Sequence, residues 1–137
     1  MQTASSVWIC FTIGIGLAAM ATTTTFGLAI DPRAYAGLRR LDPDLRLEQV
    51  CDLEAMSRIK RETKFSPDRA KSYVVTAPVH EGDLLRADGA AFRSRGEWYR
   101  FSFTCKGTPD HLGVVAFSYV IGRLIPKSQW ADYSLWR

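Results

Sequence analysis

Charged side chains are absent from the first thirty residues of the chain, and all 18 basic and 14 acidic side chains lie from Asp31 onward. The stretch 7–21 is largely apolar, has about the length of a signal-peptide hydrophobic region, and ends in Ala19-Met20-Ala21. That ending is a small-x-small sequence of the kind that signal peptidase accepts. We therefore expect a signal peptide in residues 1–30 and a single domain in residues 31–137.

A membrane anchor is the alternative for the same N-terminal segment. Hydrophobicity resumes at Phe26, and the stretch from Val7 to Ile30 is long enough to cross a bilayer core of about 30 Å. The threonines of Thr22–Thr25 interrupt that stretch, and no Lys or Arg precedes it. Both interpretations predict an exported domain, either released or anchored to a membrane by the leader.

Two of the three cysteines, Cys51 and Cys105, lie within the predicted domain, whereas Cys10 lies in the leader. In an oxidising compartment, such a pair is most simply explained by a disulfide, which would close a loop of about 54 residues. Two buried free thiols are the alternative. A redox-active pair is not expected, because the sequence contains no Cys-x-x-Cys.

Capping residues and apolar spacing predict helices near the start of this domain. Asp-Pro pairs at 31–32 and 42–43 are typical of an N-cap followed by the first helical residue. The apolar residues after the second pair recur at spacings of three and four. We expect a short helix at 32–40 and a main helix at 43–61, with one or two further helical turns opening at Ser66-Pro67-Asp68.

The remainder of the chain has mostly strand character. Short strands are expected at 72–77, 84–86 and 91–95, with a turn at 87–89, and longer strands at 98–106 and 113–122. Alternation assigns two sets of side chains to the core: Tyr99, Phe101, Phe103 and Cys105 on one long strand, and Val115, Phe117, Tyr119 and Ile121 on the other.

Aromatic residues at spacings of three predict a C-terminal helix at 127–135 that closes one end of the core. The expected fold class is therefore α+β, with N-terminal helices packed on an antiparallel sheet of about four strands and a C-terminal helix. Cys51 on the main helix and Cys105 on the sheet would staple the two layers together.

Three segments resemble a known family: LDPDLRLEQVCDLEAM at 41–56, AFRSRGEWYRFSFTC at 91–105 and PKSQWADYSLW at 126–136. The family is domain of unknown function 930, found in exported proteins of Alphaproteobacteria. The resemblance extends over nearly all of residues 38–136. It implies an exported bacterial protein, either periplasmic or anchored to the inner membrane and facing the periplasm. It also implies cysteines at positions 51 and 105, and it assigns no catalytic residue.

No motif in the sequence indicates a catalytic, metal or cofactor site. His80 and His111 are the only histidines and fall in expected turns or strand ends, where surface positions are typical. A zinc site would need Cys or carboxylate partners at suitable spacing, and neither a Gly-x-Ser-x-Gly elbow nor a phosphate-binding glycine loop is present. We expect a protein that is not an enzyme; the alternative is a small envelope hydrolase using His111 or a helix carboxylate.

The second face of the predicted hairpin is the candidate binding surface, because it combines an aromatic ring with arginines and hydroxyls. The net charge of +4 and the pI of about 9.1 favour anionic partners, but no basic run is long enough to indicate nucleic acid. The predicted function is a cell-envelope binding or accessory domain for an anionic envelope ligand or a partner protein. An anchored subunit of a membrane complex, with membrane contact through residues 7–30, is a further alternative. The candidate face consists of Arg93, Arg95, Trp98, Arg100, Ser102 and Thr104.

Overall fold

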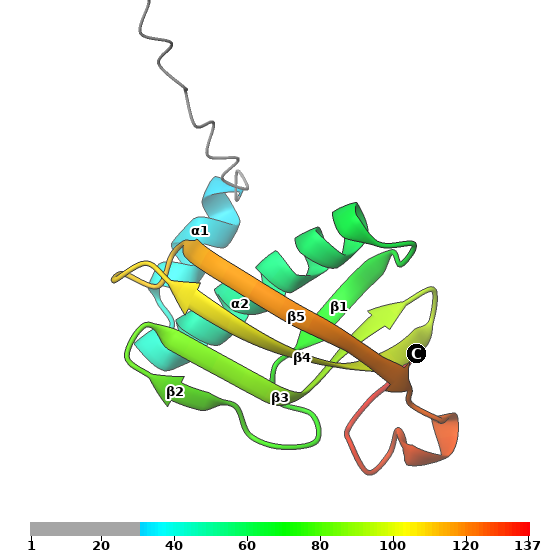
Figure 1. The fold of residues 1–137 in the computed structure, drawn as a ribbon. Helices are drawn as coiled ribbons and strands as arrows, with labels where there is room; N and C mark the ends of the chain where they lie inside the picture. The colour runs from blue at the N-terminus through cyan, green and yellow to red at the C-terminus, as the bar shows by residue number, and fades with distance from the viewer. Residues whose placement is uncertain (1–30) are drawn as a thin grey trace, which may run out of the picture.

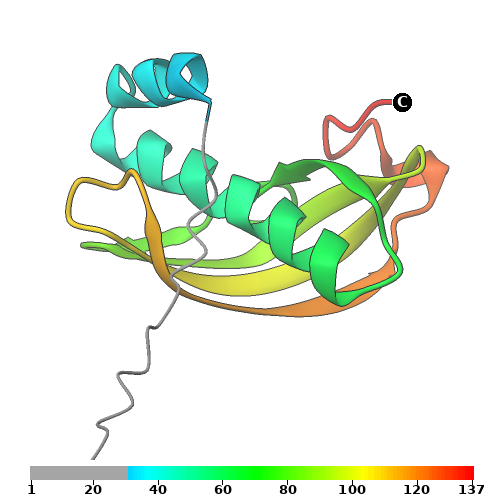
Figure 2. The ribbon, with the colours of Figure 1, turned by 90° about the horizontal axis from the view of Figure 1, so that it is seen from above.

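A computed structural model describes residues 31–137, and the predicted leader at 1–30 lies outside these residues. The described chain begins with two helices and continues as an antiparallel sheet (Figures 1 and 2). No helix between residues 31 and 137 has both the length and the apolar character that crossing a membrane requires. The elements are α1 (Pro32–Arg39), α2 (Pro43–Glu62), β1 (Pro67–Lys71), β2 (Val79–Glu81), β3 (Leu84–Ser94), β4 (Glu97–Gly107), β5 (Val114–Leu124) and the 3₁₀ helix η1 (Lys127–Gln129).

Local capping defines both helices, as the sequence predicts. The Asp31 carboxylate accepts the backbone N–H of Arg33 at 2.8 Å, and Asp42 accepts that of Asp44 at 3.1 Å. A proline follows each cap at the first helical position. An N–H at that position has no partner within the helix, so proline loses no hydrogen bond there. The predicted helix starts are confirmed, and α2 ends one residue beyond the predicted end.

The strands are paired in the order β1-β3-β4-β5, all antiparallel, and β2 pairs with the first part of β3. In Figure 2, α2 lies along one face of the sheet. The long β4–β5 hairpin is present as predicted, with Phe103 opposite Tyr119 and Cys105 opposite Phe117. The predicted α+β class, with N-terminal helices and an antiparallel sheet, is thus confirmed.

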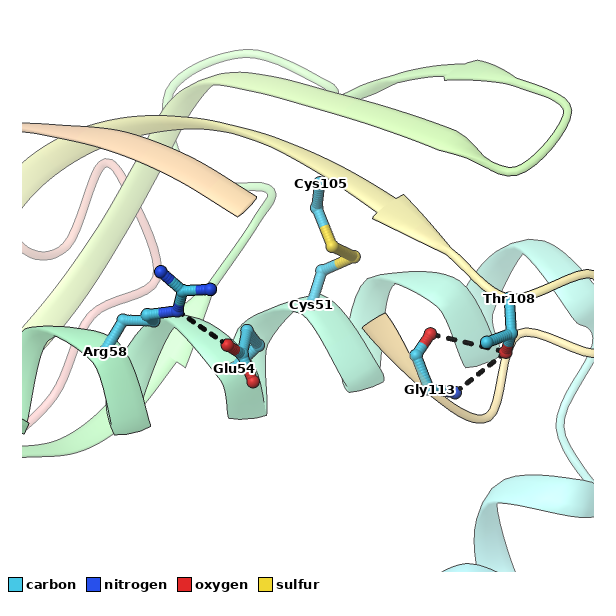
Figure 3. The surroundings of a disulfide bond; sticks show 6 residues. All are labelled: Cys51, Glu54, Arg58, Cys105, Thr108 and Gly113. Carbon is cyan, nitrogen blue, oxygen red and sulfur yellow. Dashed lines mark hydrogen bonds and ion pairs between the residues drawn. A yellow bond between two sulfur atoms is a disulfide. The ribbon is translucent and has the colours of Figure 1, made fainter. Parts of the chain in front are cut away.

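The main core lies between α2 and the facing side of the sheet. Successive turns of α2 contribute Leu47, Cys51, Ala55 and Ile59, all fully buried, because a spacing of four keeps them on one side of the helix. The sheet side supplies mainly aromatic side chains, including Phe92, Phe101 and Phe103. A disulfide joins Cys51 to Cys105 through this core, with 6.0 Å between the Cα atoms (Figure 3).

One expected core residue is exposed. Val115 has 65% of its surface accessible, although the alternation of β5 placed it with Phe117 and Tyr119. The register between β4 and β5 shifts between Lys106 and Gly107, so that Gly107 pairs with Val114. This bulge places Val114, rather than Val115, against the core.

The segment between α2 and β4 differs most from the predictions. Residues 66–68 are not helical turns, because β1 begins at Pro67 and pairs with the end of β3. The strand predicted at 72–77 is an irregular loop. Two backbone amides of this loop find an acceptor outside regular strand pairing: the N–H groups of Val74 and Val75 both donate to the Gly89 carbonyl, at 3.0 and 2.8 Å.

The turn predicted at residues 87–89 is a β-bulge inside one continuous strand, β3. Ala87 pairs with Phe103 and Ala90 with Phe101, so Asp88 and Gly89 together oppose Ser102. Gly89 is needed at this point, because a Cβ there would lie 2.3 Å from the backbone nitrogen of Thr76. The Asp88-Gly89 pair resembles a turn in the sequence. In the structure it is the point at which the loop of residues 72–77 lies against β3.

The predicted C-terminal helix at 127–135 is wrong, since only the short η1 forms there. A helix of this length is marginal in water, and tertiary contacts determine the conformation instead. Trp130 and Leu135 bury their side chains in a second cluster with Ala91, Trp98 and Ile125. Ala91 and Trp98 alternate with residues of the main core, so this cluster lies on the opposite face of the sheet.

Candidate functional site

The sheet face turned away from α2, called here the outer face, carries the candidate binding residues. The C-terminal segment covers one end of it. On the remaining part, Thr104 of β4 lies between Arg86 of β3 and Ser118 of β5, and Ser102 lies opposite Val120. Ser102, Thr104 and Ser118 form a group that we call the hydroxyl row.

The hydroxyl row lines a shallow depression of about 140 Å³, together with Asp88 and Val120. Ser118 is exposed, and Ser102 and Thr104 are half-buried, so the hydroxyl row lies at the surface of the sheet. Arg86 is exposed beside Thr104, and Lys106 is exposed at the end of the same strand. The outer face therefore combines hydroxyl donors with basic groups, and Asp88 provides one opposing charge.

Trp98 does not contribute an exposed ring to this face, because it is fully buried. Its indole Nε1 donates to the backbone carbonyl of Trp136 at 2.8 Å, and its ring packs against that of Trp136 at a centroid distance of 5.7 Å. The cover comes from the C-terminal segment. Trp98 thus anchors that segment to the sheet, and it is unavailable to a ligand.

The three arginines of the predicted face have different surroundings. Arg93 forms a two-pronged ion pair with Asp68, at 2.9 and 2.7 Å, and this pair lowers the pKa of the Asp68 carboxyl. Arg100 donates to the hydroxyl of Tyr133 at 3.0 Å and lies 5.6 Å from the centre of that ring. Arg95 is exposed at the β3–β4 turn and lines a separate hollow with Phe65 and Tyr99.

The structure therefore places Trp98, Arg100, Ser102 and Thr104 on one face of β4, with Arg93 beside Trp98. Trp98, Arg93 and Arg100 are held in internal contacts, which leaves Ser102 and Thr104 as the predicted residues of the hydroxyl row. Arg86 and Asp88 were missed as members of this face. The sequence predicts a short strand that ends at Arg86 and a turn that contains Asp88, and neither prediction gives these residues a neighbour on β4. Recognising the Asp88-Gly89 pair as a bulge would have extended β3 and revealed both residues.

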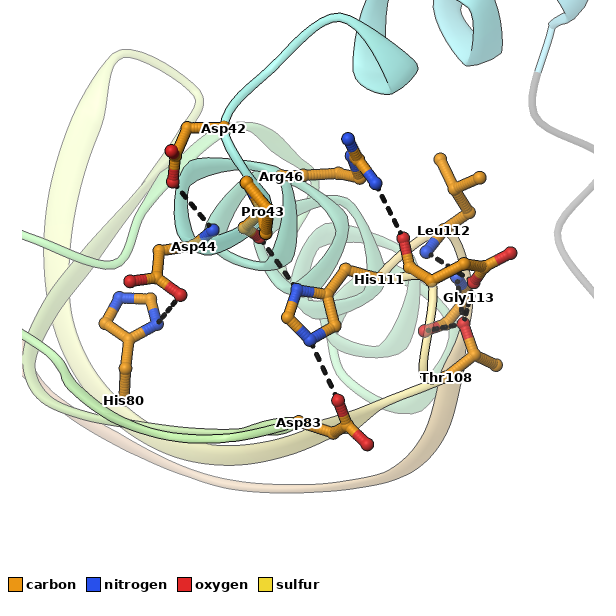
Figure 4. Close-up of polar contacts among 11 residues, drawn as sticks. Asp42, Pro43, Asp44, Arg46, His80, Asp83, Thr108, His111, Leu112 and Gly113 are labelled. Carbon is orange, nitrogen blue, oxygen red and sulfur yellow. Dashed lines mark hydrogen bonds and ion pairs between the residues drawn. The ribbon is translucent and has the colours of Figure 1, made fainter.

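Both histidines belong to polar networks rather than to the open surface (Figure 4). His111 is 7% exposed, which contradicts the expected surface position. Its Nδ1 lies 2.8 Å from the Pro43 carbonyl oxygen, and its Nε2 lies 3.0 Å from Asp83 Oδ1. His80 Nε2 lies 2.8 Å from Glu48 Oε1, and its Nδ1 lies 3.8 Å from Asp44 Oδ1.

One carboxyl group of α2, that of Asp52, is buried, with 6% of the residue exposed. Burial is the main cause that raises its pKa from 3.8 to about 7, and the nearby Glu48 carboxylate adds to the rise. Asp52 Oδ2 accepts the backbone N–H of Ser72 at 3.2 Å, whereas Oδ1 has no hydrogen-bond partner among the described residues. Across residues 31–137, no group of three or more His, Cys, Asp or Glu side chains has an arrangement suited to a metal ion.

Comparison with known proteins identifies a family for this chain. No curated protein and no solved structure matches it. Residues 38–135 match the family described as Domain of Unknown Function (DUF930), a range that starts within α1 and ends just short of the C-terminus. It includes the disulfide, both histidine networks and the whole outer face. The chain therefore belongs to the DUF930 family.

Proposed function

We propose that this chain is an exported, periplasm-facing accessory domain that binds an anionic ligand of the cell envelope through its outer face. The observation that carries the proposal is the hydroxyl row with Arg86 and Lys106 beside it. Guanidinium and hydroxyl groups donate hydrogen bonds to phosphate and carboxylate oxygens, and those bonds are strengthened by the charge of the acceptor.

The cross-strand geometry supports simultaneous contact by these groups. Thr104 is directly paired with Arg86 on one side and Ser118 on the other, and directly paired side chains lie about 5 Å apart. A ligand with repeated phosphate or carboxylate groups would span the three strands at this level. The shallow depression suits a surface-bound polymer or lipid headgroup better than an enclosed small molecule.

The disulfide supports the proposed compartment. Cys51 and Cys105 are both fully buried and bonded through the core, and structural disulfides persist in oxidising compartments such as the bacterial periplasm. The uncharged segment 1–30 is consistent with export. Thiol labelling of fractionated cells without reductant tests this part. We expect a periplasmic, unreactive Cys51–Cys105 pair, and a reduced pair in the cytosol would overturn the assignment.

Sequencing of the mature N-terminus distinguishes a free periplasmic protein from an anchored subunit of a membrane complex. A start near residue 22 indicates cleavage after Ala21. Retention of residues 7–30 in a membrane fraction indicates the anchor. Hydrolysis by His111 has less support, because both of its ring nitrogens already face acceptors within the domain.

Ligand binding by the outer face is tested with vesicles of phosphatidylglycerol, with phosphatidylcholine vesicles for comparison, and with soluble peptidoglycan fragments. We expect Arg86→Glu to weaken binding to at least one anionic probe by about tenfold. Arg33→Glu is the matched control, because it makes the same charge change at an exposed position on α1, outside the sheet. Equal losses from the two variants would indicate non-specific charge attraction and would contradict a site on the outer face.

A further inference from the structure

We propose that the imidazolium form of His111 is a pH-dependent latch, which holds the β4–β5 loop, residues 108–113, against the start of α2 and the β2–β3 turn. His111 is the buried residue of this loop and contacts both elements (Figure 4). Loss of its proton releases one of the two contacts. The proposal does not depend on what the outer face binds.

The argument starts from the two acceptors around the ring. Nδ1 faces the carbonyl oxygen of Pro43 at 2.8 Å, and Nε2 faces a carboxylate oxygen of Asp83 at 3.0 Å. A carbonyl and an ionised carboxylate can only accept, so each short contact requires an N–H on the ring. Neutral histidine has one N–H and the imidazolium has two. The observed geometry is therefore satisfied in full only by the charged ring.

The backbone of the loop adds a reason why those contacts matter. His111 has φ = 57°, in the left-handed region that side chains other than glycine rarely adopt. Such a conformation is unfavourable on its own and persists where surrounding contacts enforce it. The ring bonds to Pro43 and Asp83 are contacts of that kind. A weakened latch should therefore let the loop relax.

Arg46 and Asp110 carry two further charges at the loop, and neither group contributes to the latch. Arg46 of α2 donates to the Asp110 carbonyl at 2.9 Å and remains charged, because arginine is not deprotonated in proteins. Hydrogen bonds from the Thr108 hydroxyl and the Leu112 amide lower the pKa of the Asp110 carboxyl. His111 is therefore the residue of this loop whose two ring contacts depend on its own charge.

His80 forms a separate network on the same part of α2. It faces Glu48 and Asp44, and Glu81 is its neighbour on β2. A neutral His80 ring can still donate from Nε2 to Glu48, so its short contact does not require the charged form. His80 is therefore the natural control residue for the latch.

The consequence of the latch concerns a surface hollow of about 460 Å³ between α1 and the β4–β5 loop. Its lining consists of Tyr35 from α1 and Thr108, Pro109, Asp110, Leu112 and Gly113 from the loop. Because His111 is the buried anchor of that loop, its protonation state controls how firmly one wall of the hollow is held. We expect an ordered wall near pH 5.5 and a looser one near pH 8.

Nitrogen NMR of the full chain with ¹⁵N-labelled histidine tests the latch. At pH 5.5 we expect both ring nitrogens of His111 to carry a proton. Amide exchange in residues 108–113, corrected for intrinsic pH dependence, should quicken about threefold or more by pH 8. These loop signals should titrate together with the His111 ring. A neutral His111 ring at pH 5.5, or loop signals that ignore its titration, would overturn the proposal.

Three variants separate the latch from general packing. Asp83→Asn keeps the His111 ring but removes the carboxylate that it faces. The Asp83 side chain is exposed, so the variant should fold. The change in loop amide exchange between pH 5.5 and pH 8 should fall at least twofold. His80→Gln should leave that effect unchanged. His111→Gln should abolish it if the variant folds, and Asp83→Asn decides the question if it does not. If the loop of the Asp83→Asn variant keeps the full pH response, the latch proposal is wrong.

Discussion

Cys51 and Cys105 join the middle of α2 to the core face of β4 through a disulfide whose Cα atoms lie 6.0 Å apart. Both residues are fully buried, and 54 positions separate them in the sequence. Closing a loop of that length removes conformational freedom from the unfolded chain. We expect the double variant Cys51→Ala, Cys105→Ala to lose about 4 kcal/mol of unfolding free energy, measured by urea denaturation.

Reduction provides an independent control for this prediction. Unmodified protein unfolded in excess reductant should approach the stability of the double variant, since both treatments remove the same cross-link. A loss below about 1 kcal/mol in the double variant would show that the link adds little to the packing of α2 on the sheet.

The cluster on the outer face should depend strongly on Trp98. This side chain is fully buried between Ala91 and the C-terminal segment, and its indole N–H donates to the Trp136 carbonyl. Trp98→Ala should therefore lower the free energy of unfolding by about 3–5 kcal/mol, as for other large buried aromatic residues. Chemical denaturation followed by circular dichroism measures the loss.

Trp136→Ala is the matched control, because Trp136 is 47% exposed and its backbone carbonyl remains in the variant. This variant should lose less than about 1.5 kcal/mol of unfolding free energy, which is the upper range for an aromatic pair such as Trp98–Trp136. If both variants lose the same stability, the C-terminal segment is not held by the Trp98 side chain.

The parts of the fold that sequence predicts well are those determined by local signals. Asp31 and Asp42 cap the helices two residues ahead of the amide each one binds, and Phe101, Phe103 and Cys105 alternate along one strand. Both patterns act within a few residues, so no knowledge of distant contacts is needed.

The parts that sequence predicts poorly depend on contacts between distant segments. Trp130, Tyr133 and Trp136 have the helical spacing of three, yet burial of Trp130 and Leu135 in the cluster around Trp98 determines the conformation. The same limit applies to the candidate site. The burial of Trp98 follows from the C-terminal segment that covers it, and the position of Arg86 follows from the bulge that makes β3 one continuous strand. Composition alone indicates neither.

Gly89 should be intolerant of any side chain. A Cβ at this position would lie 2.3 Å from the backbone nitrogen of Thr76, and backbone atoms cannot move aside cheaply. The loop would shift and weaken the bonds from Val74 and Val75 to the Gly89 carbonyl. We expect Gly89→Ala to cost about 1–3 kcal/mol in thermal or chemical unfolding.

Gly37→Ala is the control for that substitution, because an added Cβ on α1 would meet nothing within 4 Å. Alanine favours helix over glycine, so this variant should be unchanged or more stable by up to about 1 kcal/mol. Equal losses in the two variants would mean that the close approach at Thr76 does not constrain Gly89.

The buried carboxyl of Asp52 should make the domain more stable in mild acid than in base. Its pKa is about 7 in the folded protein, against an ordinary value of 3.8, so the folded state binds an extra proton between these two pH values. The contribution of this group to stability therefore rises as the pH falls from about 7 to 4, by on the order of 1 kcal/mol per pH unit. Asp52→Asn keeps an oxygen for the Ser72 amide but carries no charge, so the variant should be the more stable protein at pH 8. Urea denaturation of both proteins from pH 5 to 8 measures the difference in unfolding free energy between them. The histidine contributions cancel in that difference. Two parallel curves of unfolding free energy against pH would contradict the prediction.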